Sequence, residues 1–418
     1  MNEPLFRSRP GAFDIRPASQ SEATRVTDGI WLSEGLSNAY LVLTPAGRVV
    51  INTGMGFEAP VHKRNFDAVD RGPVRYILLT QAHVDHVGGV ALFREPGTQI
   101  IAQANNRICQ ADDARIHPFR VAHSAPFFPT AVGTAEKHRH VQARPEPTIT
   151  FTDRHAFELG GVRFELISTP GGETIDSTCI WLPQTRTAFV GNVFSALFGH
   201  FPNLVTLRGD RYRFALPFID AVDRVLGLEP ELLLTGHFGP IRGADLVRTE
   251  LTRVRNAVQY VHDATVKGMN EGKDVFTLMR EITLPPELEV GEGYGCVSWS
   301  VRAIWEGYAG WFHQRSTTEL YPVPASTVYP DIVELAGGAA VVAGRARQRL
   351  AAGDAVAAIH LAEMALGADA ASRPALQVYL AAHERLLDER GGRNFWETGW
   401  LRHQIERTRR ALDTRDGV

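Results

Sequence analysis

Short apolar runs rich in β-branched and aromatic residues dominate the first half of the chain. Runs of this kind, bounded by Gly, Pro, Asn or Asp, are typical of strands in a sheet. They predict strands within residues 28–35, 38–47, 48–56, 74–79, 99–104, 148–161, 162–173, 179–183, 187–192 and 231–240. Pro45-Ala46-Gly47 predicts a hairpin turn between the second and third of these runs. A helix is predicted between the third and fourth, over residues 57–72.

Apolar residues change to helical spacing after residue 240. Val247, Leu251, Val254, Val258 and Val261 follow the period of a helix. From about residue 265 onward the chain is predicted to be mostly helical. It includes a helix from Asp354 to Leu366, with Gly353-Asp354 and Gly367 as capping signals.

The segment 105–148 has no clear periodicity. It is polar, contains several prolines and includes Phe127-Phe128-Pro129. Long segments of this kind are usually either covers over an active site or poorly ordered. The two phenylalanines could face an apolar substrate, but we expect ordinary packing for them.

Candidate metal ligands stand where predicted strands end. The stretch Thr80–Gly89 follows the apolar run 74–79 and carries His83, Asp85 and His86. Loops at the ends of rigid strands often carry chemistry, and His with Asp at this spacing can converge on a metal ion. Three more strand ends bring candidate ligands next to a glycine: Glu173, Asn192 and His237. Several strand ends with ligand-type residues predict a metal site mounted on a sheet.

Composition limits the protein class. A chain of 418 residues with 44% hydrophobic and 22% charged residues predicts a globular protein of more than one domain. A net charge of -3, without a run of Lys or Arg, argues against a nucleic-acid binder. The cysteines Cys109, Cys179 and Cys296 are odd in number and widely spaced, which argues against a disulfide framework. No signal peptide or membrane span is expected, so we predict a cytoplasmic protein.

Several motifs resemble those of the metallo-β-lactamase superfamily and of its linear alkylsulfatase branch. The superfamily motif H-x-H-x-D-H corresponds to Gln81–His86 in this chain. Segments 203–209, 260–272, 294–312 and 392–399 resemble segments characteristic of alkylsulfatases, and the resemblance extends from about residue 28 to about 410.

This resemblance implies a fold, a domain order and a partner. The fold would be an α/β protein, an αββα metallo-β-lactamase sandwich with a C-terminal all-α dimerisation domain. The expected divisions are a lead-in over residues 1–25, the metal-binding domain over 26–265 and the dimerisation domain over 266–418. A homodimer is expected, with no nucleic acid or membrane partner. A sterol-carrier-like third domain of larger members is missing from this sequence, so we expect the alcohol part of a substrate to be small.

Three positions depart from the superfamily pattern. Gln81 replaces the first histidine ligand, and Asn192 replaces the carboxylate that bridges two metal ions. Asn52 stands where an aspartate commonly orients that first histidine. Amides are neutral and poorly basic, so they are weaker ligands than imidazole or carboxylate. All three changes are expected at one of the two metal positions.

The resemblance therefore implies two unequal ligand sets. The weakened first position would have Gln81, His83 and Glu173, with Asn192 between the two positions. The second would keep Asp85, His86 and His237 complete, a three-ligand set with room for water, as in catalytic zinc sites. We expect one tightly bound Zn²⁺ rather than two, with Fe²⁺ or Mn²⁺ as other candidates.

The chemistry expected from this site is hydrolysis of a small anionic ester, such as an alkyl sulfate monoester. A metal-bound water would be the nucleophile, and His83, Asp85 and Glu173 are the candidate catalytic residues. Asn203, Arg208 and Arg213 correspond to the anion-binding region of alkylsulfatases, although a structural salt bridge is an alternative role for the arginines.

Two other functions remain open. One carboxylate with two histidines is also the ligand set of non-haem iron oxygenases. A non-catalytic binding protein with a degraded metal site is the other alternative.

Overall fold

The chain folds as two compact units in a computed structural model that describes residues 3–205, 207, 209 and 213–413. The first unit comprises Met1–Ala125 and Pro129–Tyr308, and the second comprises Pro126–Phe128 and Ala309–Val418. The division predicted between residues 265 and 266 falls instead within one continuous helix, α8 (Ala244–Asn270). The predicted lead-in contains two short 3-10 turns, at Leu5–Arg7 and Ala12–Asp14, and the start of the first strand.

Two mixed β-sheets form the first unit. One sheet has seven strands in sequence order: β1 (Thr24–Thr27), β2 (Ile30–Ser33), β3 (Ala39–Thr44), β4 (Gly47–Ile51), β5 (Val74–Leu78), β6 (Gln99–Gln103) and β7 (Ile149–Phe151). The other has six strands in the order β13-β12-β11-β10-β9-β8. Their bounds are β8 (Arg154–Leu159), β9 (Val162–Ser168), β10 (Thr178–Leu182), β11 (Thr187–Gly191), β12 (Leu232–Thr235) and β13 (Ile241–Arg242). The predicted hairpin is confirmed, since Thr44 pairs with Gly47 across the β3–β4 turn.

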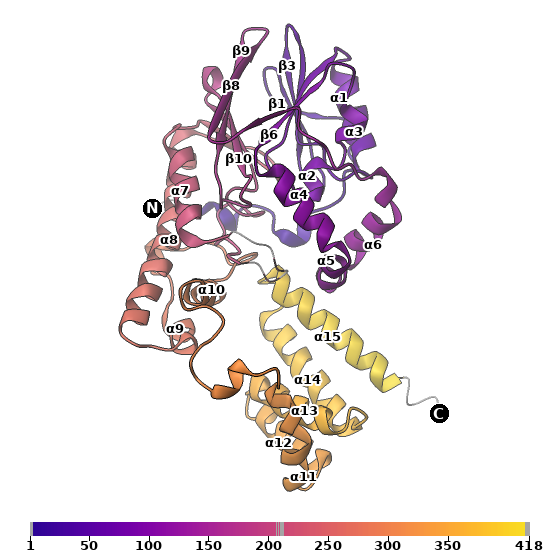
Figure 1. The fold of residues 1–418 in the computed structure, drawn as a ribbon, viewed down its shortest axis with the longest axis vertical. Coiled ribbons are helices and arrows are strands. Elements are labelled where there is room, and N and C mark those ends of the chain that lie inside the picture. Colours follow the sequence, from indigo (N-terminus) through magenta and orange to yellow (C-terminus); the bar gives the residue numbers. More distant parts are fainter. Residues whose placement is uncertain (1–2, 206, 208, 210–212, 414–418) are drawn as a thin grey trace. The chain divides into compact units, whose positions relative to one another are not determined.

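The sheets pack face to face and carry helices on their outer faces, as Figure 1 shows. A core of apolar side chains lies between them, including Tyr40, Ile51 and Leu78 from one sheet and Phe189 and Leu234 from the other. The first sheet packs outside against α1 (Ala59–Val69) and α3 (Val90–Phe93). The second packs against α7 (Ala215–Leu226), α8 and α10 (Val297–Ala309), with α9 (Val275–Glu281) beside them. The αββα sandwich predicted from the sequence is confirmed.

Strand direction explains why distant polar residues meet at one edge of the sandwich. Strands β4 to β7 run parallel, and so do β11 and β12. Strand β9 is antiparallel to β10, which is antiparallel to β11, so β9 and β11 share a direction. The carboxyl ends of parallel strands lie at the same edge of a sheet, where α/β proteins usually place their sites.

The segment 105–148, expected to be either a cover over an active site or poorly ordered, is largely helical. It contains α4 (Asn106–Arg115), α5 (His117–Ser124) and α6 (Pro129–Lys137), with a 3-10 turn at Arg139–Val141. Few side chains in these helices are buried, which explains why their apolar period is weak. Phe127 and Phe128 belong to the second unit and pack against Trp396, with ring centroids 5.1 and 5.3 Å apart. The expectation of ordinary packing for them is confirmed.

The described part of the second unit contains helices and no strands. Its α-helices are α11 (Tyr329–Leu335), α12 (Ala339–Ala351), α13 (Ala355–Ala368), α14 (Arg373–Arg390) and α15 (Phe395–Asp413), and two 3-10 helices precede them at Thr317–Leu320 and Ala325–Val328. Its core is rich in alanine, including Ala343, Ala346, Ala362 and Ala365, which allows close helix packing. The predicted N-cap of α13 is confirmed, since the Asp354 carboxylate accepts a hydrogen bond from the Ala357 N–H. The predicted end at Leu366 is wrong, because Gly367 lies within the helix, which ends at Ala368. None of the described helices is long and apolar enough to cross a membrane.

Candidate metal centre

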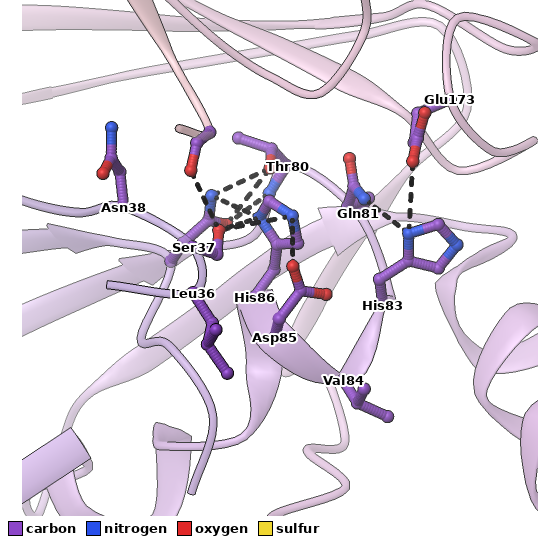
Figure 2. A network of polar contacts seen from close by, with 12 residues as sticks. Leu36, Ser37, Asn38, Thr80, Gln81, His83, Val84, Asp85, His86 and Glu173 are labelled. Carbon is purple, nitrogen blue, oxygen red and sulfur yellow. Dashed lines mark hydrogen bonds and ion pairs between the residues drawn. The ribbon is translucent and has the colours of Figure 1, made fainter. Parts of the chain in front are cut away.

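The loop after β5 carries the histidine–aspartate motif into a short helix, α2 (Val84–Val87). His83 precedes the helix, and Asp85 and His86 lie within it, with the His86 N–H bonded to the His83 carbonyl at 2.9 Å. Consecutive residues of a helix point in different directions. Figure 2 accordingly shows two groups of polar contacts, one around His86 and one around His83.

The first group surrounds His86, which is fully buried. Its Nε2 lies 3.5 Å from the Asp85 carboxylate. Its Nδ1 contacts the Ser37 hydroxyl at 3.1 Å and the Asn52 amide nitrogen at 3.0 Å. Burial lowers the pKa of His86 to about 4, and the Asp85 charge only partly opposes this effect. The ring is therefore neutral at pH 7, the form that binds metals.

The sequence predicted that Asn52 lies at the metal position of Gln81. In the structure Asn52 contacts His86 and therefore belongs to the first group. Strand β4 ends at Ile51, and Asn52 adopts a left-handed conformation with φ 57, which asparagine tolerates well. The Thr80 backbone N–H donates to Asn52 Oδ1 at 3.0 Å. That bond fixes the orientation of the amide, so Asn52 presents its N–H₂ to His86. The three amide replacements therefore do not all fall at one metal position.

His237 follows β12 and lies next to the same group. Asn38 holds this turn by donating hydrogen bonds to the carbonyls of Thr235 and Phe238, at 3.0 and 2.8 Å. Burial lowers the pKa of His237, whereas the Asp85 charge and a backbone hydrogen bond to Leu36 raise it. Its ring Nδ1 is buried and has no hydrogen-bond partner among the described residues.

The second group consists of Gln81, His83, Glu173 and Arg213. The Gln81 amide nitrogen lies 2.8 Å from His83 Nδ1, and the same ring nitrogen lies 3.5 Å from Glu173 Oε1. Arg213 donates to Glu173 Oε1 at 2.6 Å and to the Glu173 backbone carbonyl at 2.8 Å. The side chains of Glu173 and Arg213 are each only 4% exposed. Arg213 thus forms a buried ion pair, the structural role that was the alternative to anion binding.

Asn192 and Asn203 are also buried, at 4% and 5% exposure. Asn192 Oδ1 lies so close to Gly236 that a Cβ there would be 2.0 Å from it, which explains the glycine before His237. Asn192 Oδ1 and Asn203 Nδ2 have no hydrogen-bond partner in the described part of the chain. Arg208, the other predicted anion-binding residue, lies outside the described residues.

An apolar cavity of about 170 Å³ lies beside Arg213. The start of α7 supplies Phe214 and Leu216 to its wall, and α10 supplies Ala303, Ile304 and Gly307. His262 and Tyr308, which contact each other at 2.9 Å through Nε2 and the hydroxyl, also line it. The cavity combines an apolar wall with one buried cation.

The fit of these residues to a metal ion differs between the two groups. Among residues 3–205, 207, 209 and 213–413, no three or more His, Cys, Asp and Glu side chains are arranged to hold an ion. The predicted set Asp85, His86 and His237 lies close together but is not a preformed coordination site. Its donors nevertheless fit one ion, because they comprise a carboxylate and two neutral imidazoles. The buried Nδ1 of His237 also has no hydrogen-bond partner among the described residues. The second group does not fit, since an amide replaces one ligand and a guanidinium contacts another.

Two family models match the chain. The metallo-beta-lactamase superfamily matches residues 32–237, and the alkyl sulfatase dimerisation family matches residues 276–397. Residues 32–237 therefore carry a metallo-beta-lactamase domain, and residues 276–397 carry an alkyl sulfatase dimerisation domain. A metallo-beta-lactamase domain implies a divalent metal ion.

Similar proteins include a linear primary-alkylsulfatase of a Pseudomonas species, which is 27% identical over 75% of this chain and 62% of its own length. The alkyl/aryl-sulfatase BDS1 of Saccharomyces cerevisiae is 25% identical over 77% of this chain and 54% of its own. The solved structure of the inverting sec-alkylsulfatase Pisa1 from Pseudomonas matches with a TM-score of 0.80 and 21% identity, over 93% of this chain and 65% of that one. The chain therefore spans less than two thirds of the relatives that it matches, and the Pisa1 likeness shows the fold.

Three buried residues of this site were not anticipated from the sequence. Ser37 contacts His86, and Glu58 accepts backbone hydrogen bonds from Ala18 and Leu36, which holds the loop containing Ser37. Burial raises the pKa of Glu58 to about 7. Asp176 is buried near His83 and accepts a hydrogen bond from Asn106 at 2.8 Å. Only Asp176, close after Glu173, carried a sequence signal that could have revealed it.

Proposed function

We propose that this protein is a metal-dependent hydrolase of a small anionic ester, and that its substrate is an alkyl sulfate monoester. The names of the relatives give the substrate class. The observation that carries the proposal is the donor set Asp85, His86 and His237, in which burial keeps both imidazoles neutral. These three residues would hold one Zn²⁺, which when bound lowers the pKa of a water toward neutrality.

The other residues around the centre have roles in substrate binding and proton transfer. His83 lies beside Glu173, so His83 is the candidate proton acceptor and Glu173 the group that orients it. Asn203, with Arg208, is the candidate contact for the sulfate oxygens. The cavity beside Arg213 has an apolar wall suited to the organic group of the ester. Arg213, which is paired with Glu173, lies at the edge of that cavity.

The test is sulfate release from alkyl sulfates of increasing chain length, using protein stripped of metal and reloaded with Zn²⁺, Mn²⁺ or Fe²⁺. We expect turnover with at least one metal and its loss in Asp85→Ala and His237→Ala. Gln81→Ala is the matched control and should lose much less, because it lies in the group that does not fit an ion. Equal losses in the three variants would show that the two groups are ranked wrongly.

The same experiment separates the two alternative functions. Substrate-dependent oxygen uptake with Fe²⁺, without sulfate release, would indicate an oxygenase that uses the same carboxylate and two histidines. Tight substrate binding without turnover under any of the metals would indicate a non-catalytic binding protein.

We also propose that the helical unit pairs two chains into a homodimer. The alkyl sulfatase dimerisation model covers most of this unit. Large apolar side chains are exposed on its helices, including Leu335 at 89%, Val341 at 56% and Val356 at 55% exposure. A contiguous apolar surface built from such side chains would be typical of a face that binds another protein.

A further inference from the structure

The ion pair between Arg213 and Glu173 stands at the position where the resemblance places the first metal ion. The guanidinium donates to the Glu173 carboxylate and to the Glu173 backbone carbonyl. Two contacts from one planar group fix both its position and its direction. Both side chains are almost completely buried, so this pair is not a transient surface contact.

The same carboxylate oxygen faces both the guanidinium and the imidazole of His83. Glu173 Oε1 is 2.6 Å from Arg213 Nη2 and 3.5 Å from His83 Nδ1. Gln81, at the position of a histidine ligand, contacts His83 through its amide nitrogen instead. A metal ion shared by His83 and Glu173 would therefore lie next to a fixed positive charge. Coulomb repulsion in a buried site disfavours that arrangement strongly.

A buried carboxylate requires a compensating charge. In this group Gln81 is neutral, and the nearby Asp176 adds no positive charge. Among the described residues, Arg213 is a buried cation in contact with Glu173.

We propose that the guanidinium of Arg213 replaces the first metal ion of the centre. It neutralises Glu173 and holds it against His83, so the centre needs only the ion bound by Asp85, His86 and His237. The inference rests on the proposed function for that neighbouring ion. It assigns Arg213 as a positioning residue that acts through Glu173, not as a direct contact for the substrate anion.

The test counts metal ions in variants of the full-length protein by titration with Zn²⁺ and elemental analysis after gel filtration. Arg213→Met removes the cation, and Arg213→Lys retains one. Each is made alone and together with Gln81→His, which restores a strong ligand. We expect the Gln81→His variant to bind no more metal than the unchanged protein. The double variant Gln81→His, Arg213→Met should gain about one equivalent of Zn²⁺ per chain. The double variant Gln81→His, Arg213→Lys should gain none.

Three outcomes would overturn the inference. If Gln81→His alone gains an ion, the guanidinium does not exclude metal. If Arg213→Met, alone or with Gln81→His, loses metal, then Arg213 supports a metal ligand rather than replacing an ion. If the double variant Gln81→His, Arg213→Met gains no ion, removing the cation does not allow a metal ion to bind at the first metal position.

A second measurement covers the possibility that Arg213→Met folds poorly. Arg213→Met removes the Arg213 cation from the buried Glu173 carboxylate. Zn²⁺ should therefore raise the melting temperature of the Gln81→His, Arg213→Met variant more than that of Gln81→His. An equal rise in both would contradict the inference.

The design separates this inference from the proposed function. The inference predicts that the Gln81→His, Arg213→Met variant gains an ion relative to the unchanged protein. This gain can be measured even if the unchanged protein binds no metal. The proposed function fails instead if no metal-loaded form releases sulfate.

Discussion

The contact between Asn52 and His86 predicts how firmly the centre holds its ion. Asn52 Oδ1 is committed to the Thr80 backbone N–H, so its N–H₂ donates to His86 Nδ1 at 3.0 Å. His86 Nδ1 then accepts, and the ring proton lies on Nε2, the nitrogen that faces Asp85. Metal binding through Nε2 requires the other tautomer, in which Nδ1–H would meet the N–H₂ of Asn52. The asparagine therefore opposes metal binding at His86.

Asn52→Asp should reverse this effect. An aspartate retains an acceptor for the Thr80 N–H, and its second oxygen accepts from His86 Nδ1–H, which leaves the Nε2 lone pair for the metal. The Thr80 hydroxyl, 3.0 Å from Asn52 Nδ2, can rotate to donate. Partners that orient a ligand histidine in this way typically change metal affinity by roughly 10- to 100-fold, which is about 1.4 to 2.7 kcal/mol. Aspartate also tolerates the left-handed backbone of this position.

The assay is competition for Zn²⁺ against a chromophoric chelator, with the unchanged protein and two variants. We expect Asn52→Asp to bind Zn²⁺ at least 10-fold more tightly. The metal-free variant should melt at a lower temperature, because position 52 is 1% exposed and the new carboxylate is buried. Ser37→Ala removes the other contact of His86 Nδ1 without adding a charge, so it should not show this gain. Unchanged or weaker Zn²⁺ binding by Asn52→Asp would refute the tautomer argument.

Three further predictions concern other parts of the chain. Leu335→Glu places a charge on the most exposed of the described large apolar side chains, so light scattering should show a shift from dimer toward monomer; a monomeric unchanged protein would contradict the proposed dimer. Ala303→Leu narrows the apolar cavity, so KM should rise roughly 10-fold or more for long-chain alkyl sulfates but little for ethyl sulfate; equal effects on both would exclude this cavity as the alkyl site. Burial lowers the pKa of His62, His86 and His200 to about 4, which favours the fold above pH 6.5 and disfavours it as the pH falls toward 4, whereas the raised pKa of Glu58, about 7, acts in the opposite direction. With about 1.4 kcal/mol per pKa unit, the three histidines outweigh Glu58, and the unfolding free energy of metal-free protein should rise by about 5 kcal/mol from pH 4 to 6.5; a fall over this range in urea unfolding would contradict that sum.

The sandwich could be predicted from the sequence because its strands are short apolar runs that end at glycine, proline or polar residues. Strands β10 and β11 are buried at every position, and their sequences are almost continuously apolar. The helices within 105–148 could not be predicted, because few of their side chains are buried. The packing of Phe127 on Trp396 joins residues far apart in the chain, and no local pattern encodes such a contact.

The residue types of the centre could also be predicted, but their pairing could not. Strand ends indicated which side chains would gather, and the structure places Asp85 beside His86. The partner of Asn52 was predicted wrongly. The direction of this side chain depends on the left-handed backbone of Asn52, with φ 57, and the sequence does not show that angle. Arg213 pairs with Glu173 forty positions earlier in the chain, and only the fold brings them together.

The most direct test of the account is elemental analysis of protein purified without added metal. The account predicts one kind of divalent metal at no more than about one equivalent per chain. That metal should be lost in His237→Ala and retained in Gln81→Ala. Two equivalents per chain, or loss of metal in Gln81→Ala with retention in His237→Ala, would contradict the assignment of the centre to Asp85, His86 and His237.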